Sequence, residues 1–455
     1  MTTRTTPSAL GTLPFAGHAP RMLRDPLRFL SSLPAQGDLV DIQLGTMKVT
    51  VVCDRELTRQ LLLADDICDK GGPWYDRIRE TIGNGLVTCP HHVHRRQRRL
   101  IQPSFHPSRL PGYARTMVSR ATAVSDGWHD GQVIDVPPLM LTLSMRALLQ
   151  NLFSSALDPQ TAQDAIDDLR TILRAIHRRT MLPPALNRLP TVGNRRYHAA
   201  GQRLRRNLQT VIAGQRQAGK DYGDLLSAML SARDTADDGS ESALADAEIS
   251  DQLITFFAAG SETMANILSW TLYLLSRHPE IEQRLHAEVD SVLAGSSPAC
   301  LDDLDRLPFL NRVMRETLRL YPPVWMVTRE VTAETTLSGH AIPAGSAIML
   351  SPYLLHRQSD VYPDPERFDP DRWDSAHCPQ PPRHAFIPFG LGPRKCIGDQ
   401  YGMALAALAL ATFSSRWQLS ALSDAEVRPV AHTSLTPAAL RLRAIERPLH
   451  PLPRR

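Results

Sequence analysis

The sequence Phe389–Gly398, Phe-Gly-Leu-Gly-Pro-Arg-Lys-Cys-Ile-Gly, is the most informative part of this chain. Its cysteine, Cys396, lies among three glycines and two cations, Arg394 and Lys395, and the Ala- and Leu-rich residues 401–413 follow at once. Those residues are typical of a buried helix, so Cys396 should lie in a turn before a helix N-terminus, where the dipole and both cations favour a thiolate. The glycines let the backbone pass close to a large flat ligand, and a rigidly held thiolate suits haem iron. The alternative is a buried structural cysteine.

The same residues match the pattern Phe-x-x-Gly-x-Arg-x-Cys-x-Gly at Phe389, Gly392, Arg394, Cys396 and Gly398. This stretch therefore resembles the haem-ligand loop of the cytochrome P450 family. The resemblance implies Cys396 as the metal ligand and Phe389, Arg394 and Gly398 as cofactor-binding residues. It also implies the P450 fold, mainly α with a small β-sheet lobe (α+β).

The resemblance covers residues 20–445, because further motifs of the family follow in order along the chain. We therefore expect an N-terminal arm over residues 1–20 and a single haem-thiolate monooxygenase domain over residues 21–455.

Composition excludes several other classes of protein. Of 455 residues, 42% are hydrophobic and 22% charged, which is ordinary for a globular protein. The net charge of +4 gives no global case for nucleic-acid binding. Six scattered cysteines argue against a disulfide framework or a zinc site and for a reducing compartment. No early apolar run reaches the roughly 18–20 residues of a membrane span, and no secretory leader is recognisable, so we expect a cytoplasmic protein. We also expect it to be a monomer.

Periodicity predicts several elements. Alternating apolar residues indicate a hairpin of residues 39–44 and 48–52 around Gly45, followed by a helix over residues 55–63. A second hairpin is expected within residues 340–350. Expected further along are amphipathic helices over residues 145–230 with a break at 182–184, a long basic helix over residues 195–215, a polar linker over residues 234–246, and a turn over residues 433–437.

A long apolar helix is predicted over residues 249–275, and Gly260-Ser261-Glu262-Thr263 interrupts its apolar run. An acid–alcohol pair inside an apolar helix is costly unless it has partners or a function, although a threonine hydroxyl can simply bond the preceding turn. Gly260 would leave space for a small ligand. The stretch resembles the P450 motif Ala/Gly-Gly-x-Asp/Glu-Thr, which implies catalytic roles for Thr263 and Glu262 in delivering protons to dioxygen.

Cations at three positions resemble the propionate-binding residues of P450s. His94 and Arg98 lie four residues apart, so a helix would place them on one face. His94 stands where the family often has Trp, but both side chains can donate to a carboxylate. Arg329 matches a further propionate-binding arginine. The neighbouring Arg95, Arg96 and Arg99 suit a docking face for an acidic redox partner or form a solvated basic face.

Glu316 and Arg319 lie three apart, as in the family's Glu-x-x-Arg motif, and Arg372 lies in the later stretch that supplies a second arginine. The resemblance implies that these three residues maintain the fold and retain haem, without a chemical role.

Substrate contacts are expected from apolar side chains in the segments that surround the P450 pocket. They are Trp74, Ile82, Leu86, Phe257, Ala258, Val324, Trp325, Val327 and Leu435. Because none carries a charge, the substrate should be a neutral hydrophobic molecule. Several motifs resemble those of actinobacterial sesquiterpene-oxidising members, which implies a terpene substrate. Macrolides, fatty acids and steroids are the alternative substrates.

Together these features predict a haem-dependent monooxygenase that inserts one O2-derived oxygen into a hydrophobic molecule. Its cofactors would be haem b and O2, with NAD(P)H-derived electrons arriving through ferredoxin reductase and ferredoxin, because no flavin or ferredoxin module is fused to the sequence. A peroxide-driven hydroxylase or haem isomerase, and a non-catalytic haem-thiolate sensor, are the rival functions.

Overall fold

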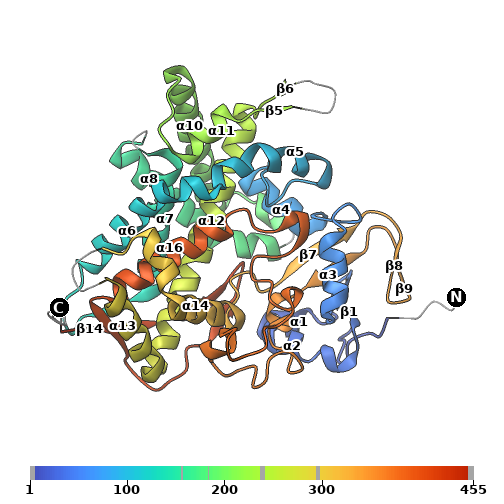
Figure 1. Ribbon diagram of the computed structural model, residues 1–455. Helices are drawn as coiled ribbons and strands as arrows, with labels where there is room; N and C mark the ends of the chain where they lie inside the picture. The colour runs from blue at the N-terminus through green and yellow to red at the C-terminus, as the bar shows by residue number, and fades with distance from the viewer. Residues whose placement is uncertain (1–5, 155–156, 183, 236–240, 294–297, 449–455) are drawn as a thin grey trace. The chain divides into compact units, whose positions relative to one another are not determined.

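The computed structural model describes residues 6–154, 157–182, 184–235, 241–293 and 298–448 (Figure 1). The chain divides into two compact units, one formed by residues 1–76 and 316–396 and the other by residues 77–315 and 397–455. We call them the sheet unit and the helical unit. That residues 21–455 behave as a single domain remains a prediction.

Most of the described chain is helical. The α-helices are α1 (Ala19–Arg24), α2 (Pro26–Ser31), α3 (Arg55–Leu63), α4 (Gly72–Ile82), α5 (His91–Ile101), α6 (Leu110–Ser125), α7 (Val136–Phe153), α8 (Pro159–Met181), α9 (Pro184–Arg188), α10 (Val192–Ala218), α11 (Leu225–Ser231), α12 (Asp246–Arg277), α13 (Pro279–Leu293), α14 (Pro308–Leu320), α15 (Pro352–Leu355) and α16 (Asp399–Ser414). Short 3-10 helices are η1 (Pro34–Gln36), η2 (Gln102–Phe105), η3 (Pro107–Arg109), η4 (Leu301–Arg306), η5 (Pro370–Trp373), η6 (Arg383–Ala385) and η7 (Gly392–Arg394).

The strands are short. They are β1 (Leu39–Leu44), β2 (Met47–Val52), β3 (Cys68–Asp69), β4 (Val133–Asp135), β5 (Asp234–Thr235), β6 (Glu241–Ser242), β7 (Val327–Val331), β8 (Thr335–Leu337), β9 (His340–Ile342), β10 (Ala347–Leu350), β11 (Trp417–Ala421), β12 (Pro429–Ala431), β13 (Leu435–Pro437) and β14 (Arg441–Glu446).

The sheet unit is built on five strands in the order β1-β2-β10-β7-β3. The expected first hairpin is confirmed, with Leu39 opposite Val52 and Gly45 in the left-handed region at the turn. Helix α3 has the predicted bounds, because the Asp54 carboxylate caps it by accepting from the Leu57 N–H at 2.8 Å. Its apolar face packs into the core of this unit.

The second expected hairpin, within residues 340–350, is wrong. Strand β9 pairs with β8, whereas β10 pairs in parallel with β2 and antiparallel with β7. The turn that forms lies at Ser338 and Gly339, both at positive φ. Strand β10 is the apolar run Ala-Ile-Met-Leu, whose last three residues are buried, so it becomes an inner strand with two partners.

The helical unit is organised around α12, which runs beside α7 and α16 in Figure 1. Helix α12 is continuous through its polar interruption and extends the predicted range at both ends. Two glycines permit its close packing. A Cβ on Gly260 would lie 2.8 Å from the Leu148 side chain of α7, and one on Gly402 of α16 would lie 2.8 Å from Met264. The space at Gly260, expected to receive a small ligand, is therefore occupied by Leu148.

The remaining helices and strands follow the sequence closely. Helix α8 ends at Met181 and α9 begins at Pro184, so Pro184 of the predicted break is helical, and residue 183 of that break lies outside the described residues. Helix α10 contains the basic helix. Strands β5 and β6 lie in the expected polar linker, and the turn near residues 433–437 is part of the β12–β13 hairpin. Among the described residues, no helix has both the length and the apolar character needed to cross a membrane.

Candidate functional site

Two glycines in the cysteine loop adopt the left-handed backbone conformation. Gly390 and Gly392 have φ of +73° and +71°, a region that only glycine adopts without strain. A side chain on Gly392 would also collide with the Leu62 carbonyl of α3. The Cys396 N–H donates to the Phe389 carbonyl at 2.8 Å, which closes the loop and leaves the cysteine side chain exposed.

Arg394 anchors this loop to the strand before α4. Its guanidinium is buried and lies 2.7 Å from the Asp69 carboxylate and 3.4 Å from that of Asp65. We expected this arginine to favour a thiolate at Cys396, but two carboxylates already balance its charge. A direct contact between Arg394 and a cofactor remains a prediction.

The cysteines differ in how well they can serve as metal ligands. Cys53, Cys68 and Cys89 are buried, whereas Cys396 and Cys300 are exposed. Burial raises the pKa of the Cys53 thiol to about 12 and that of Cys68 to about 11. Those two thiols stay protonated at neutral pH and are poor metal ligands, because the thiolate is the ligating form.

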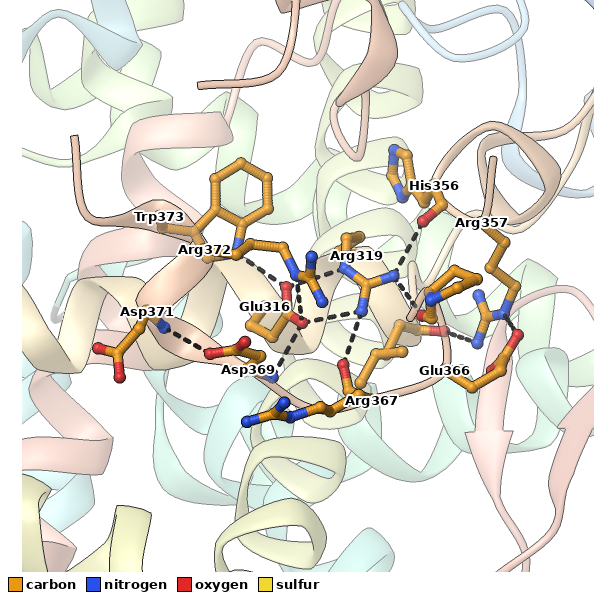
Figure 2. A network of polar contacts seen from close by, with 12 residues as sticks. Glu316, Arg319, His356, Arg357, Glu366, Arg367, Asp369, Asp371, Arg372 and Trp373 are labelled. Carbon is orange, nitrogen blue, oxygen red and sulfur yellow. Dashed lines mark hydrogen bonds and ion pairs between the residues drawn. The ribbon is translucent and has the colours of Figure 1, made fainter. Parts of the chain in front are cut away.

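A buried ionic network joins the C-terminal part of α14 to η5 and to the residue before it (Figure 2). The Glu316 carboxylate accepts from Arg319 at 2.8 and 2.9 Å, from Arg372 Nε at 3.1 Å and from Trp373 Nε1 at 2.9 Å. It also accepts the Asp369 N–H at 3.0 Å. The structure thus brings together the three residues predicted to form this network and adds Trp373.

Arg319 uses every N–H group it has. Besides its two bonds to Glu316, it donates to the carbonyls of His356, Pro365 and Arg367 at 3.0, 2.6 and 3.1 Å. These are five donors in the fixed planar arrangement of a guanidinium. Neither Glu316 nor Arg319 has any exposed surface, so water cannot replace any of these hydrogen bonds if one is lost.

Arg329 lies on β7 and is buried, with 5% of its surface exposed. It donates to the Thr328 carbonyl at 2.8 Å and the Tyr75 hydroxyl at 3.3 Å, both neutral acceptors. Within the part of the chain that the structure describes, no carboxylate pairs with it. A buried cation without a counterion is costly, so this site favours an anionic ligand group.

Helix α5 carries the two other predicted propionate ligands. Both lie on α5, which confirms the predicted helix, and His94 is buried whereas Arg98 is half-buried. Between them, the Gln97 side chain fixes α5 to α12, because its carbonyl accepts from Gln252 Nε2 at 2.8 Å. The Gln252 carbonyl accepts the Leu86 N–H at 3.0 Å, which attaches the segment after α4 to the same point. Neither glutamine was predicted as a site residue, although Gln252, a polar residue in the apolar helix α12, was a usable signal.

The cations of α5 are less available to a partner than their number suggests. Arg96 pairs with Glu248 at 2.7 Å, and Arg99 pairs with Asp234 at 2.8 Å. Arg95 is exposed.

The acid–alcohol pair lies in the middle of α12. The Thr263 hydroxyl donates to the Ala259 carbonyl at 2.6 Å, the back-bond considered for this position. Burial raises the pKa of Glu262, and a hydrogen bond with Ser434 of the β12–β13 hairpin opposes that rise. Glu262 therefore holds a proton at higher pH than an exposed glutamate does.

The predicted substrate residues are distributed over both units. Trp74, Val324, Trp325 and Val327 belong to the sheet unit, and Ile82, Leu86, Phe257, Ala258 and Leu435 to the helical unit. Within the helical unit, Phe257 lines a small apolar cavity among α7, α8, α10 and α12. Val324 is exposed, whereas Trp325 and Leu435 are buried. Their contact with substrate remains a prediction.

Comparison with known proteins identifies the family. The model of the family described as Cytochrome P450 matches residues 7–443. This chain belongs to the cytochrome P450 family. The P450 is 45% identical over 441 residues to pentalenene oxygenase from Streptomyces avermitilis, covering 97% of each chain. It is 42% identical to cyclooctat-9-en-7-ol 5-monooxygenase from Streptomyces melanosporofaciens, covering 95% of this chain and 91% of the relative.

A solved structure supports the same conclusion. The crystal structure of the cytochrome P450DA heme domain superimposes with a TM-score of 0.88 and 26% identity, covering 98% of this P450 and 99% of that chain. The predicted family and fold class are confirmed, and the enzyme class is that of a P450 monooxygenase.

Members of the family use haem, O2 and electrons from an external donor. The residues of this P450 fit such a group. Cys396 offers an exposed thiol on a glycine-containing loop, and the buried guanidinium of Arg329 would gain a counterion from a haem propionate.

Proposed function

We propose that this P450 oxidises a sesquiterpene-like terpene hydrocarbon, with Cys396 as the thiolate ligand of haem and ferredoxin as the electron donor. The observation that carries the substrate class is the full-length similarity to pentalenene oxygenase and to cyclooctatin synthase, the latter at 41% identity over 436 residues. The expected contact residues are apolar, which suits a neutral hydrocarbon.

Haem would be held by Cys396 through its sulfur and by His94, Arg98 and Arg329 through its propionates, with Phe389, Arg394 and Gly398 shaping the loop. When bound, the haem would supply oxygen activation, and a thiolate ligand would favour that chemistry over reversible O2 binding.

The chain itself supplies protons and orientation. The Thr263 hydroxyl is held by the Ala259 carbonyl and can pass a proton from Oγ1. Glu262, next to it in sequence, has a pKa raised by burial, so it holds a replacement proton at higher pH than an exposed glutamate does. An enzyme driven by peroxide, or a haem isomerase, could dispense with this pair.

The ligand assignment is tested with the reduced, CO-bound absorption spectrum. We expect the band of a thiolate-ligated haem in the native protein and its loss in Cys396→Ser. Cys300→Ser is the matched control, because Cys300 is also exposed and lies outside the loop. A thiolate band that persists in Cys396→Ser, or an imidazole-ligated spectrum in the native protein, contradicts the assignment.

The substrate class is tested by titrating the ferric protein with pentalenene, a fatty acid, a macrolide and a steroid. We expect a high-spin shift with the terpene and oxygenated product when ferredoxin and its reductase are supplied. A full shift with one of the other classes and none with terpenes would refute the terpene proposal. Turnover of none of the four would favour a sensor.

The proposal that ferredoxin donates the electrons is tested by substitution of an arginine on the cationic face of α5. Arg95 is exposed, whereas Arg99, which is also exposed, pairs with Asp234. Arg95→Ala should therefore weaken ferredoxin-supported reduction about 3-fold or more at low ionic strength and less at high salt. Arg28→Ala, an exposed arginine of α2, removes the same charge elsewhere. Equal effects of the two substitutions would argue against docking at α5.

A further inference from the structure

One face of α12 holds the β12–β13 hairpin through side-chain hydrogen bonds. Glu262, Asn266 and Trp270 recur every four residues and so lie on this face. Asn266 Nδ2 donates to the Ser434 hydroxyl at 2.7 Å and to the Thr436 hydroxyl at 3.2 Å. Trp270 Nε1 donates to the carbonyl of the residue between these two, at 2.9 Å. The hairpin segment is therefore fixed in register along the helix.

The hydrogen bond from Asn266 decides how Ser434 can act. A serine hydroxyl has one proton and two acceptor positions. Because the oxygen already accepts from Asn266, the hydroxyl proton is available for a second partner. Glu262 lies one helical turn before Asn266 on the same face of α12, so its carboxylate is placed to accept this proton, and interaction with Ser434 lowers the pKa of Glu262. Asn266 and Ser434 are both 3% exposed, so water competes weakly for these bonds.

We propose that Ser434, oriented by Asn266, is a positioning residue that directs the Glu262 carboxyl for proton delivery to Thr263. The inference rests on the proposed proton-transfer role of Glu262 and Thr263 and adds the residues that hold the acid in place. It also assigns a second role to the hairpin, whose Leu435 is an expected substrate contact.

The expected effect follows from the direction of the hydrogen bond. A donor to a carboxylate favours its charged form, so removing the Ser434 hydroxyl should raise the pKa of Glu262 further. In Ser434→Ala, the midpoint of the pH dependence of coupled turnover should move about one pH unit higher. Product formed per NADPH consumed should fall several-fold because the carboxyl is no longer directed.

The hairpin offers a matched control. Thr436→Val removes the other hydroxyl that Asn266 contacts, on the same strand, while leaving Ser434 in place. We expect its pH midpoint to stay within about 0.2 unit of the native value. Ser434→Thr keeps a hydroxyl and should restore coupling. If Ser434→Ala does not fold, Ser434→Val and Ser434→Thr can be compared instead, because these two side chains have similar volume and only threonine carries a hydroxyl.

A measurement without turnover gives an independent readout. Infrared titration of the carboxyl stretch in the ferric protein, with Glu262→Gln to assign the band, reports the pKa of Glu262 directly. We expect the band to titrate at higher pH in Ser434→Ala than in Thr436→Val. Equal titration in both variants would overturn the proposal and leave the hairpin with a structural role alone.

Glu262→Gln separates this inference from the proposed function. If that variant keeps native coupling and pH dependence, the proton-transfer role of Glu262 fails. If it loses them while Ser434→Ala behaves as native, the relay stands and the role of Ser434 is refuted.

Discussion

Replacing Arg319 by lysine should destabilise this P450 severely, although the charge is kept. Arg319 donates five hydrogen bonds in a site with no solvent exposure, two to Glu316 and three to main-chain carbonyls. Lysine has three donors, so at least two buried acceptors lose their partner. Each unsatisfied acceptor costs about 1–3 kcal/mol, which gives a loss of about 2–6 kcal/mol. That is a large part of the 5–15 kcal/mol typical of a folded protein.

The loss can be measured by urea unfolding at pH 7, followed by circular dichroism and tryptophan fluorescence. Arg55→Lys is the matched control, because Arg55 pairs with Asp360 in the same unit but both side chains are partly exposed. An exposed pair contributes about 0–1 kcal/mol, so this variant should unfold near the native midpoint. A difference below about 1 kcal/mol between the two variants would refute the reasoning. Haem retained per mole of protein should fall in parallel with stability.

Three further predictions concern the site and its surroundings. Thr263→Ala should uncouple NADPH oxidation from product formation, by about 10-fold or more if general-acid catalysis is lost, and unchanged coupled turnover would favour a peroxide-driven or isomerase mechanism. Gly392→Ala should lower the free energy of unfolding by about 1–3 kcal/mol more than Gly131→Ala. Both glycines have positive φ, but only at Gly392 would the added methyl group clash with the backbone of Leu62. Equal unfolding midpoints would contradict this. Burial lowers the pKa of His356 to about 3, so between pH 6.5 and 3 this histidine is protonated in the unfolded chain but neutral in the folded one. The free energy of unfolding should therefore fall as the pH drops from 6.5 toward 3, which unfolding at several pH values would show. His356→Gln should flatten this pH dependence.

The site residues that were not predicted from the sequence are buried polar side chains. Asn266 and Gln252 interrupt the apolar pattern of α12 as clearly as Glu262 does, yet without a family motif neither could be assigned a partner. Their partners, Ser434 and Gln97, are 168 and 155 residues away in the chain. A buried amide signals that a partner exists, because an unpaired one is costly, but it does not say which residue that partner is.

The sequence alone determined the local features of this protein: the bounds of α3, the β1–β2 hairpin at Gly45, the central part of α12, and the P450 pattern around Cys396. Helical periodicity, capping and turn chemistry act over a few residues, so a short stretch specifies them. Only the tertiary structure decided that β10 is an inner strand, that Leu148 fills the space at Gly260, and that Arg394 pairs with Asp69. Those outcomes depend on which distant surfaces pack together, and many sequences with the same local patterns could pack differently.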